Sequence, residues 1–378
     1  MYIMNIHFVY GSFNPTTAVG NRTLAYMRGI SKMSVSATFY FLLPDKYYST
    51  VAEEYPNIAI EYMWKKWHIN NKLFKYIPYL INIFRLRNKL NAGDSVYMYD
   101  LNDVPKFLFG KKGIKLFYEK TEHPLVSNYG SLLRRMTLEK HIEDCRKYTG
   151  MFVISAALKK YYISQGIDSS KIHVINIIVD ADRFNNVRMI NKKRQIVYCG
   201  NANNNKDGVD QLIKSFAELK KTHGDIQLTI IGPKPNESHV DNNMSLVKKL
   251  GIENDVNFLG VVSPSMIPNC LSSALIVALD RPNSIQATYG FPTKLGEYLL
   301  SGTPAVVTRV GDIPLFLEHK VSVVFAEPND IASFSSCLEW VLDHPEESAM
   351  IGERGKQVAE RSFNYEIETR KLVEAMMA

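Results

Sequence analysis

Several features that mark particular classes of protein are missing from this chain of 378 residues. No apolar run approaches the roughly 20 residues of a membrane-spanning helix. The first residues lack the basic start and the cleavage site of a signal peptide, so we expect a strand there. No strand-like run is followed by G-x-G-x-x-G, which argues against a dinucleotide oxidoreductase. The four cysteines are scattered, with no CxxC and no cluster with histidine, which favours a reducing compartment and disfavours a zinc site.

The composition is that of a soluble globular protein, with 46% hydrophobic and 22% charged residues. The length is comfortable for two hydrophobic cores. The formal net charge of +7 is unevenly placed: residues 1–180 hold 24 lysines and arginines against 14 acids, whereas residues 181–378 hold 21 against 24. A basic first half predicts an anionic partner for that half, although a solvated basic face without a partner explains the charge equally well.

Strand-like apolar runs alternate with amphipathic helical segments along the chain, which is the pattern of a parallel α/β sheet. The strands are expected at 5–9, 37–43, 58–63, 95–99, 114–118, 150–154, 195–199, 226–231, 256–259, 274–278, 305–308 and 321–325. The helices are expected at 19–31, 72–90, 131–148, 156–165, 208–221, 244–250, 293–301 and 332–342. A linker is expected at 175–194, so two doubly wound domains are predicted, with ligands at the carboxyl ends of their strands.

The most informative segment runs from Tyr289 to Pro304. A loop with glycine and proline precedes a short helix, and a Gly-Thr-Pro stop leads into a strand. The first N–H groups of such a helix have no partner inside it, and they form a site for phosphate. Glu297 lies about one turn into the helix, where its carboxylate can accept hydrogen bonds from ribose hydroxyls.

The pattern Pro-x-Lys-x-x-Glu-Tyr that starts at Pro292, followed by Gly-x-Pro, resembles the donor-binding signature of GT-B glycosyltransferases. It is similar in particular to glycosyltransferase family 4, of the bacterial capsule and exopolysaccharide type. The resemblance implies a GT-B fold, in which two doubly wound Rossmann-like domains face a central cleft. Residues 1–176 would form the acceptor-binding domain and residues 177–362 the domain that binds a nucleotide-sugar donor. The last helix, at about 363–378, is expected to cross back onto the first domain.

A second candidate site is the loop that follows the strand ending at Cys199. This loop is rich in glycine and asparagine and tolerates positive φ, so its N–H groups can converge on an anion. Lys206 adds a point charge for a diphosphate, just before a helix that we expect Asp207 to cap. The resemblance implies that Gly200 and Lys206 contact the donor diphosphate. An ordinary turn with a solvated lysine is the alternative.

The chain departs from the usual family pattern at two positions. The arginine that usually follows the loop glycine is Asn201 here, and we expect Arg281 to supply the missing charge. The glutamate that usually stands eight residues before Glu297 is Tyr289, so we expect Lys294 to take over part of the phosphate or sugar binding. The predicted donor-binding set, with the glycine of the first strand–helix turn included, is Gly20, Gly200, Asn201, Lys206, Arg281, Phe291, Thr293, Lys294, Leu295 and Glu297.

An acceptor-side loop is expected after the strand that ends near Tyr118, where acids, a histidine and a proline follow. Family 4 enzymes carry a functional histidine or acid at this place, so the resemblance makes His123 and Glu122 catalytic candidates, with Glu119 a weaker one. A structural or solvated histidine is the alternative for His123. With two residues of the donor site added, the predicted catalytic set is His123, Glu122, Lys206 and Glu297.

No cofactor and no divalent metal are expected. Asp180 and Asp182 resemble part of the segment that joins the two domains of family 4 proteins rather than a DxD metal motif, and lysines and helix N–H groups would neutralise the donor diphosphate. Retention of configuration is implied by the family alone. A retaining hydrolase needs a carboxylate nucleophile, and the sequence identifies none. We therefore expect front-face attack with the leaving diphosphate as base, so that the catalytic load falls on stabilising the leaving group.

Bases alternate with aromatic residues in the segment 64–89, and Lys65, Lys66, Lys72 and Lys75 are among them. This composition suits an anionic membrane surface and equally single-stranded nucleic acid. A domain helix with a solvated basic face is the third alternative. We favour a membrane, because acceptors of such enzymes are often lipid-linked. The expected location is cytoplasmic, with peripheral contact to the inner face of the cytoplasmic membrane.

The sequence therefore predicts a retaining glycosyltransferase that moves a sugar from a nucleotide-diphosphate sugar to a saccharide or lipid-linked acceptor, in surface polysaccharide biosynthesis. A GT-B-fold nucleotide-sugar epimerase would use the same cleft without an acceptor. A basic nucleic-acid-binding protein is the non-enzymatic alternative, which predicts binding that weakens steeply with salt. The phosphate-site residues in the acidic half of the chain argue against that alternative.

Overall fold

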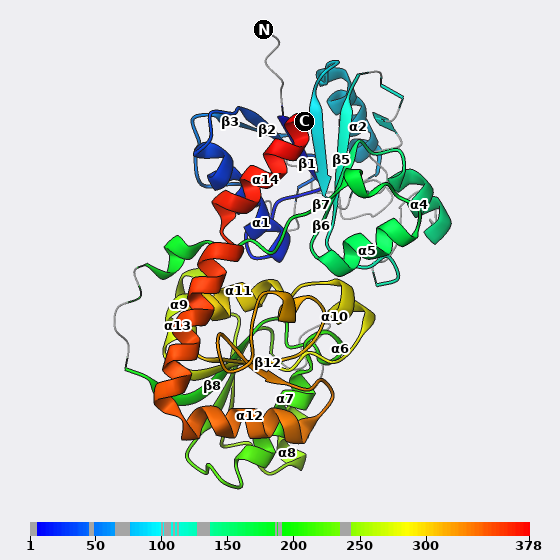
Figure 1. The fold of residues 1–378 in the computed structure, drawn as a ribbon. Coiled ribbons are helices and arrows are strands. Elements are labelled where there is room, and N and C mark those ends of the chain that lie inside the picture. The colour runs from blue at the N-terminus through cyan, green and yellow to red at the C-terminus, as the bar shows by residue number, and fades with distance from the viewer. Residues whose placement is uncertain are drawn as a thin grey trace. The chain divides into compact units, whose positions relative to one another are not determined.

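The computed structural model of the chain describes residues 6–44, 49–64, 76–99, 101, 107–108, 110–111, 113–126, 137–185, 187, 191–234 and 243–378. The chain divides into two compact units, which Figure 1 shows. Unit 1 comprises Met1–Ile178 and Tyr365–Ala378, and unit 2 comprises Val179–Asn364. The sequence placed the division after residue 176 and the return of the chain at about residue 363. None of the described helices has both the length and the apolar character that crossing a membrane requires.

The described part of unit 1 forms a seven-stranded sheet in the order β3-β2-β1-β4-β5-β6-β7, and all neighbouring strands are parallel. The strands are β1 (Ile6–Tyr10), β2 (Ala37–Phe41), β3 (Ile58–Tyr62), β4 (Ser95–Tyr99), β5 (Lys115–Lys120), β6 (Gly150–Val153) and β7 (Ile172–Val174). The α-helices of this unit are α1 (Ala18–Ser31), α2 (Tyr76–Lys89), α4 (Leu138–Cys145), α5 (Ala156–Ser164) and α14 (Tyr365–Met377).

The central strands of unit 1 are apolar because both of their faces are covered. Every residue of β1 is buried, and Phe8 on β1 stacks on Phe39 of β2 with ring centroids 4.5 Å apart. Helix α14 belongs to the same core, since Leu372 and Met376 are buried in it. The hydroxyl of Ser95 on β4 also donates to the carbonyl of Met376 at 2.8 Å. The C-terminal helix is thus part of unit 1 (Figure 1).

The described part of unit 2 forms a six-stranded parallel sheet in the order β10-β9-β8-β11-β12-β13. The strands are β8 (Lys193–Cys199), β9 (Gln227–Ile231), β10 (Val256–Gly260), β11 (Ala274–Leu279), β12 (Ala305–Thr308) and β13 (Val324–Ala326). The α-helices are α6 (Asn204–Asp207), α7 (Val209–Leu219), α8 (Asn243–Lys249), α9 (Ile267–Ser272), α10 (Ile285–Tyr289), α11 (Thr293–Leu300), α12 (Ile331–Asp343) and α13 (Pro345–Ser362). Short 3-10 helices are η3 (Ala181–Phe184) and η4 (Pro264–Met266).

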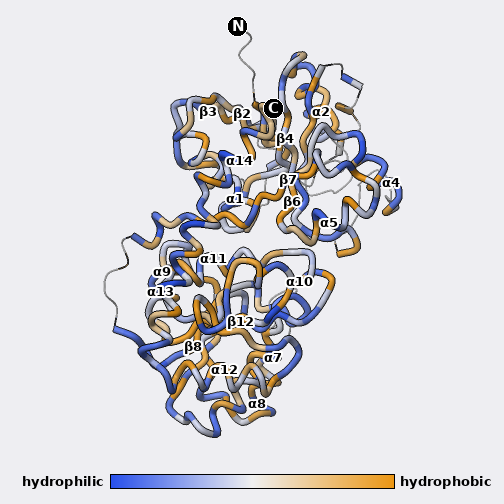
Figure 2. The backbone as a smooth tube through the Cα atoms, in the orientation of Figure 1, coloured by the Kyte–Doolittle hydropathy of each residue, from blue (hydrophilic) through white to orange (hydrophobic). Residues whose placement is uncertain are grey.

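The strands of unit 2 are also buried, and Figure 2 shows the apolar residues concentrated around β8 and β12. All four residues of β12 are buried. Helix α7 presents an amphipathic face, because Leu212, Phe216 and Leu219 are buried at the spacing of three and four residues that a helix requires. The strand order reverses between β8 and β11, so the loops that follow these two strands lead to opposite sides of the sheet.

The predicted strands are all present, with bounds that differ by up to three residues from the prediction. Strand β7, the short helices α6, α9 and α10, and helix α13 were not predicted. β7 has only three residues, and the buried face of α13 consists largely of Ser348, Gly352, Gly355 and Ala359, small side chains that give no apolar periodicity. The first parts of the predicted helices 72–90 and 131–148 lie outside the described residues.

Helices α1 and α14 lie close together at Gly29. A Cβ added to Gly29 would lie 2.5 Å from Oγ1 and 2.6 Å from Cβ of the buried Thr369. We expect Gly29→Ala to force the helices apart and to lower the free energy of unfolding by about 1–3 kcal/mol, the usual cost of overpacking. Chemical denaturation measures this change, and Gly110→Ala, where the added Cβ meets nothing within 4 Å, is the control. An unfolding midpoint equal to that of the control would contradict the prediction.

Candidate functional site

The carboxyl ends of β8 and β11 are the expected place for a ligand in unit 2, because the strand order reverses between them. Helix α11 packs against the loop that follows β8. The N–H of Cys199 donates to the hydroxyl of Tyr298 at 2.6 Å, and this hydroxyl lies 3.1 Å from the carbonyl of Cys199, to which it donates. The two segments that the sequence singled out therefore meet in unit 2, although 99 residues separate these partners.

The loops around this edge are packed closely at two glycines. A Cβ on Gly200 would lie 2.6 Å from both Nζ of Lys294 and the hydroxyl of Tyr198. A Cβ on Gly208, whose φ is +62°, would lie 1.7 Å from the carbonyl oxygen of Asp280. The backbone of the β8 loop thus lies against the side chain of Lys294 on one side and against the backbone of the β11 loop on the other.

The side chain of Lys294 links α11 to the β8 loop and to α6. Its Nζ lies 2.5 Å from Oδ2 of Asp207 and 3.3 Å from the hydroxyl of Tyr198, which itself donates to Asp207 at 2.9 Å. The side chain of Asp207 is 2% exposed and that of Lys294 17% exposed. Burial lowers the pKa of Lys294, and the negative charge of Asp207 opposes this effect.

The predicted role of Asp207 as a helix cap is wrong. The side chain of Asn203 caps α6 by accepting from the N–H of Lys206 at 2.9 Å, and Gly208 is the residue before α7. The carboxylate of Asp207 is directed to Lys294 instead, because a buried cation needs a partner of opposite charge.

The remaining charges at this edge are arranged around Lys206. Lys206 is half-buried, and Asn201 is exposed. Arg281 is only 2% exposed, and its Nε donates to the carbonyl of Lys206 at 3.3 Å, so it supports the loop from inside. Burial raises the pKa of Asp280 to about 8, and the nearby charge of Asp210 adds to this. The carboxyl of Asp280 is therefore mainly protonated at neutral pH and contributes little negative charge.

The first turn of α11 offers backbone N–H groups. Pro292 precedes the helix and supplies no side-chain cap, and among the described residues no acceptor binds the N–H of Thr293 or Lys294. Thr293 is exposed, whereas Phe291 and Leu295 are buried. These two therefore support the site through packing, and the N–H of Leu295 already donates to the carbonyl of Pro292 at 3.0 Å.

Glu297 has a partner that the sequence did not predict. Its carboxylate accepts a hydrogen bond from Nη1 of Arg183, and Nη2 of Arg183 donates to the carbonyl of Pro264 at 2.8 Å. Both side chains are about one quarter exposed, 26% for Arg183 and 23% for Glu297. Sequence reasoning placed Arg183 in the linker and gave it no role, because 114 residues separate it from Glu297.

Gly20, the predicted donor-site glycine of unit 1, has a structural reason to be glycine. A Cβ there would lie 1.8 Å from the carbonyl oxygen of Asn14. Its N–H donates to Oγ1 of Thr17, which caps α1, at 3.1 Å. This close turn accounts for the glycine without any ligand.

The two predicted acceptor-side residues of unit 1, His123 and Glu122, differ in their burial. His123 is 3% exposed, its Nδ1 accepts from the N–H of Leu125 at 3.2 Å, and its ring packs on Tyr161 with centroids 4.2 Å apart. Burial lowers the pKa of His123, so its imidazole is neutral at neutral pH. Glu122 is half-buried.

Glu119 is an internal structural residue. It is fully buried and pairs with Nη2 of Arg22 at 2.5 Å. It also accepts hydrogen bonds from the hydroxyls of Tyr26 and Tyr97. Arg22 in turn donates to the carbonyl of Asn176 at 2.9 Å. The network ties α1 to β4, β5 and the chain that leaves unit 1.

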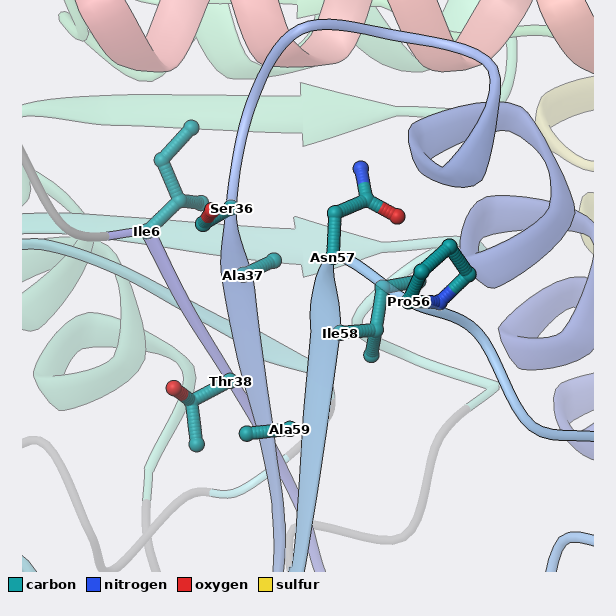
Figure 3. Close-up of a pocket in the computed structure, with 8 residues that line it drawn as sticks. All are labelled: Ile6, Ser36, Ala37, Thr38, Pro56, Asn57, Ile58 and Ala59. Atoms are coloured by element: carbon teal, nitrogen blue, oxygen red, sulfur yellow. The ribbon is translucent and has the colours of Figure 1, made fainter.

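A pocket of about 300 Å³ lies at the amino ends of β1, β2 and β3, as Figure 3 shows. Its lining residues are Ile6, Ser36, Ala37, Thr38, Pro56, Asn57, Ile58 and Ala59. Ligands of parallel sheets bind at the opposite, carboxyl edge, so we do not assign this pocket to the candidate site. Among the described residues, no group of three or more His, Cys, Asp or Glu side chains is arranged to hold a metal ion.

The segments that form the site lie in the part of the chain that matches a known family. Residues 180–358 match the family Glycosyl transferases group 1. The match covers nearly all of unit 2 and just under half of the chain, and it includes the β8 loop, Arg183 and α11. The residues of the predicted donor-binding domain are therefore similar to a glycosyltransferase family, as the sequence predicted.

Curated relatives match over part of their length. A D-inositol 3-phosphate glycosyltransferase of Corynebacterium kroppenstedtii is 27% identical over 158 residues, which are 41% of this chain and 34% of the relative. An MMP alpha-(1->4)-mannosyltransferase of Mycolicibacterium hassiacum is 24% identical over 215 residues, which are 57% of this chain and 50% of the relative. The chain thus matches between a third and a half of the length of these relatives.

Two solved structures resemble the chain over nearly its whole length. HepE of Anabaena, in complex with UDP, has a TM-score of 0.74 at 16% identity, over 98% of this chain and 99% of HepE. Sucrose-phosphate synthase of Thermosynechococcus elongatus has a TM-score of 0.75 at 14% identity, over 98% of both chains. At this identity the likeness concerns the fold, and it confirms the predicted α/β fold of two Rossmann-like domains of the GT-B class.

Breaking the buried pair of Lys294 on one side should be costly. Asp207→Asn leaves a mostly buried ammonium without its countercharge, so we expect the free energy of unfolding to fall by about 3–5 kcal/mol. Chemical denaturation measures the loss. Asp210→Asn, which removes the partner of Lys214 in a more exposed pair, should cost less than about 1 kcal/mol.

The double variant Asp207→Asn/Lys294→Met removes both charges and should recover part of that stability. If the double variant were no more stable than Asp207→Asn, the two side chains would not be energetically coupled.

Proposed function

We propose that this chain is a glycosyltransferase that takes its sugar from a nucleoside-diphosphate sugar. The observation that carries the proposal is the convergence of Lys206, Lys294 and the first turn of α11 at the carboxyl edge of unit 2. Cations and free N–H groups are the partners that a diphosphate requires. The match of residues 180–358 to glycosyl transferases group 1 supports the same conclusion.

In the proposed reaction, the main task of the site is to stabilise the leaving diphosphate. When the bond between the anomeric carbon and the diphosphate breaks, negative charge grows on the departing phosphate oxygen. Lys206, Lys294 and the N–H groups of Thr293 and Lys294 would stabilise that charge. Glu297 would accept hydrogen bonds from the ribose hydroxyls. In this scheme Asn201 and the buried Arg281 shape the phosphate loop.

We further propose that transfer retains the configuration at the anomeric carbon and needs no divalent metal. The reaction would proceed by front-face attack, in which the leaving diphosphate oxygen takes the proton of the acceptor hydroxyl. His123 and Glu122 of unit 1 remain the proposed catalytic residues on the acceptor side. The buried, neutral His123 can accept a proton or position an acceptor hydroxyl.

The proposed donor is a UDP-sugar, since HepE is similar in fold and was solved with UDP-glucose. The proposed acceptor is a saccharide or a lipid-linked saccharide of surface polysaccharide synthesis, and the proposed family is glycosyltransferase family 4, of the capsule and exopolysaccharide type. The names of the curated relatives suggest a second acceptor class, a phosphorylated polyol such as inositol 3-phosphate. An acceptor screen that includes both classes distinguishes them.

A nucleotide-sugar epimerase is the second candidate, because it would use the same donor site. It would turn over UDP-sugar with no acceptor added, whereas a transferase requires the acceptor. The nucleic-acid-binding alternative would show no affinity for nucleotide sugars.

A thermal-shift screen with UDP-, GDP- and ADP-sugars tests donor binding, because a ligand that binds the folded state raises the melting temperature. We expect Lys206→Ala to reduce kcat/KM for the sugar donor by roughly 10²–10³-fold, the usual effect of removing one group that stabilises developing charge. Glu297→Gln should reduce it by roughly 10–100-fold, the usual contribution of a hydrogen bond to a charged group. Arg309→Ala, which removes an exposed arginine of the same unit, should leave the rate unchanged.

These rates are measured in EDTA, since we propose that no divalent metal is needed. Wild-type rates in both site variants would rule out the proposed donor site. Loss of turnover in EDTA that Mg²⁺ or Mn²⁺ restores would contradict the metal-free scheme.

We also propose that unit 1 contacts an anionic membrane surface. Residues 65–75, which hold the four lysines of the sequence prediction, lie outside the described residues. The next segment, α2, exposes Ile77, Ile81 and Phe84 at 57%, 43% and 52%. Their spacing of four and three residues aligns them on one face of the helix. α2 contains three basic residues and no acidic ones, a composition that suits an interfacial helix.

We expect the protein to sediment with phosphatidylserine-containing vesicles at low salt and to be released near 0.15 M salt, where screening acts beyond about 8 Å. Changing Lys65, Lys66, Lys72 and Lys75 to glutamine should weaken binding, since each lysine near such a surface contributes about 1 kcal/mol. The control is Ile163→Ser, which removes an exposed apolar side chain of α5. Undiminished binding of the four-lysine variant, or no binding by the wild type, would remove this proposal.

A further inference from the structure

We infer that Arg183 is a positioning residue of the donor site, which orients the carboxylate of Glu297 and neutralises its charge. The inference rests on the proposed function, because it assigns the task of Arg183 in binding the nucleoside part of the sugar donor. Arg183 lies on η3, only a few residues after the chain enters unit 2.

The guanidinium of Arg183 is fixed at two points. Nη1 donates to Oε1 of Glu297, and Nη2 donates to the carbonyl of Pro264, at the start of η4, at 2.8 Å. The segment that carries Arg183 is itself held in place, since the side chain of Asp180 accepts from the N–H of Asp182 at 3.0 Å and Phe184 is buried. A planar guanidinium with two fixed partners has little freedom to turn. Its hydrogen bond therefore holds the carboxylate of Glu297 in one orientation.

This arrangement leaves the second oxygen of Glu297 for a ligand. Oε1 is occupied by Arg183, and among the described residues no hydrogen-bond donor contacts Oε2. A carboxylate with one oxygen held by arginine presents the other in a single direction. That is the geometry needed to accept a hydrogen bond from a ribose hydroxyl, because hydrogen bonds weaken steeply when the donor is misaligned.

Arg183 also neutralises the negative charge of Glu297, which would otherwise repel a bound diphosphate. Lys294 and Glu297 are three residues apart on α11, so their side chains leave the same face of the helix. A diphosphate held near Lys294 would therefore be repelled by an unpaired carboxylate at Glu297. The positive charge of Arg183 cancels that of Glu297 and leaves only its hydrogen-bonding capacity.

A purely structural ion pair would behave differently. Pairs that are as accessible as this one, at 26% and 23% side-chain exposure, usually contribute little to stability. Loss of Arg183 should then leave both unfolding and donor binding nearly unchanged. The positioning role instead predicts a selective loss of donor affinity.

The test compares Arg183→Ala, Arg183→Lys and the control Arg309→Ala, which breaks an exposed arginine pair elsewhere in unit 2. Steady-state kinetics with UDP-glucose and thermal shifts with UDP are the readouts. We expect Arg183→Ala to raise KM for the donor about ten- to a hundredfold, as misplaced binding groups do, with a smaller change in kcat and an unchanged melting temperature without ligand. Arg183→Lys, which keeps the charge, should recover part of the affinity.

A second comparison uses the Glu297→Gln background, where no carboxylate is left to orient or neutralise. There Arg183→Ala should change the affinity for UDP far less than it does in the wild type. The inference is wrong if Arg183→Ala behaves like Arg309→Ala, or if its effect is undiminished in the Glu297→Gln background. A wild-type protein that neither binds UDP nor turns over any nucleotide sugar would instead overturn the proposed function, and the inference with it.

Discussion

The buried ion pair between Lys294 and Asp207 is the interaction on which the candidate site depends. It joins the first turn of α11 to the end of α6, and through Tyr198 it reaches the strand below. A charged pair at this depth persists only if its partners are well placed, because the cost of removing either one from water is large. The pair therefore fixes the position of α11 relative to the β8 loop, and with it the N–H groups that face the carboxyl edge of the sheet.

Close packing around two glycines also helps to fix the position of the β8 loop. Gly200 leaves room for the ammonium of Lys294, and Gly208 lets the β11 loop approach. Arg281 then supports the loop from within by donating to the carbonyl of Lys206. The net charge at this edge is positive, because Lys206 stands beside the neutral pair of Lys294 and Asp207, and Asp280 is largely protonated at neutral pH. A surface with this charge and with unpaired N–H groups favours a phosphorylated ligand over a neutral one.

The fold was largely predictable because parallel sheets covered on both faces consist of long apolar strands. Strands such as β4 and β12 were predicted with their observed bounds. Helix α13 was missed because the residues that it buries are mostly small, so apolar periodicity does not reveal them. The two segments that meet at the candidate site were also recognisable in the sequence, since glycines, prolines and a single acid stand there at spacings that are typical of a phosphate site.

The sequence by itself determined which backbone segments could bind an anion, because glycine-rich turns and helix starts are local properties of the chain. Only the tertiary structure decided which charges serve that site. Asp207 is the partner of Lys294 rather than a cap, Arg281 is buried behind the loop, and Arg183 holds Glu297 across 114 residues. Ion pairs and burial depend on distances between remote segments, and no local spacing encodes such distances.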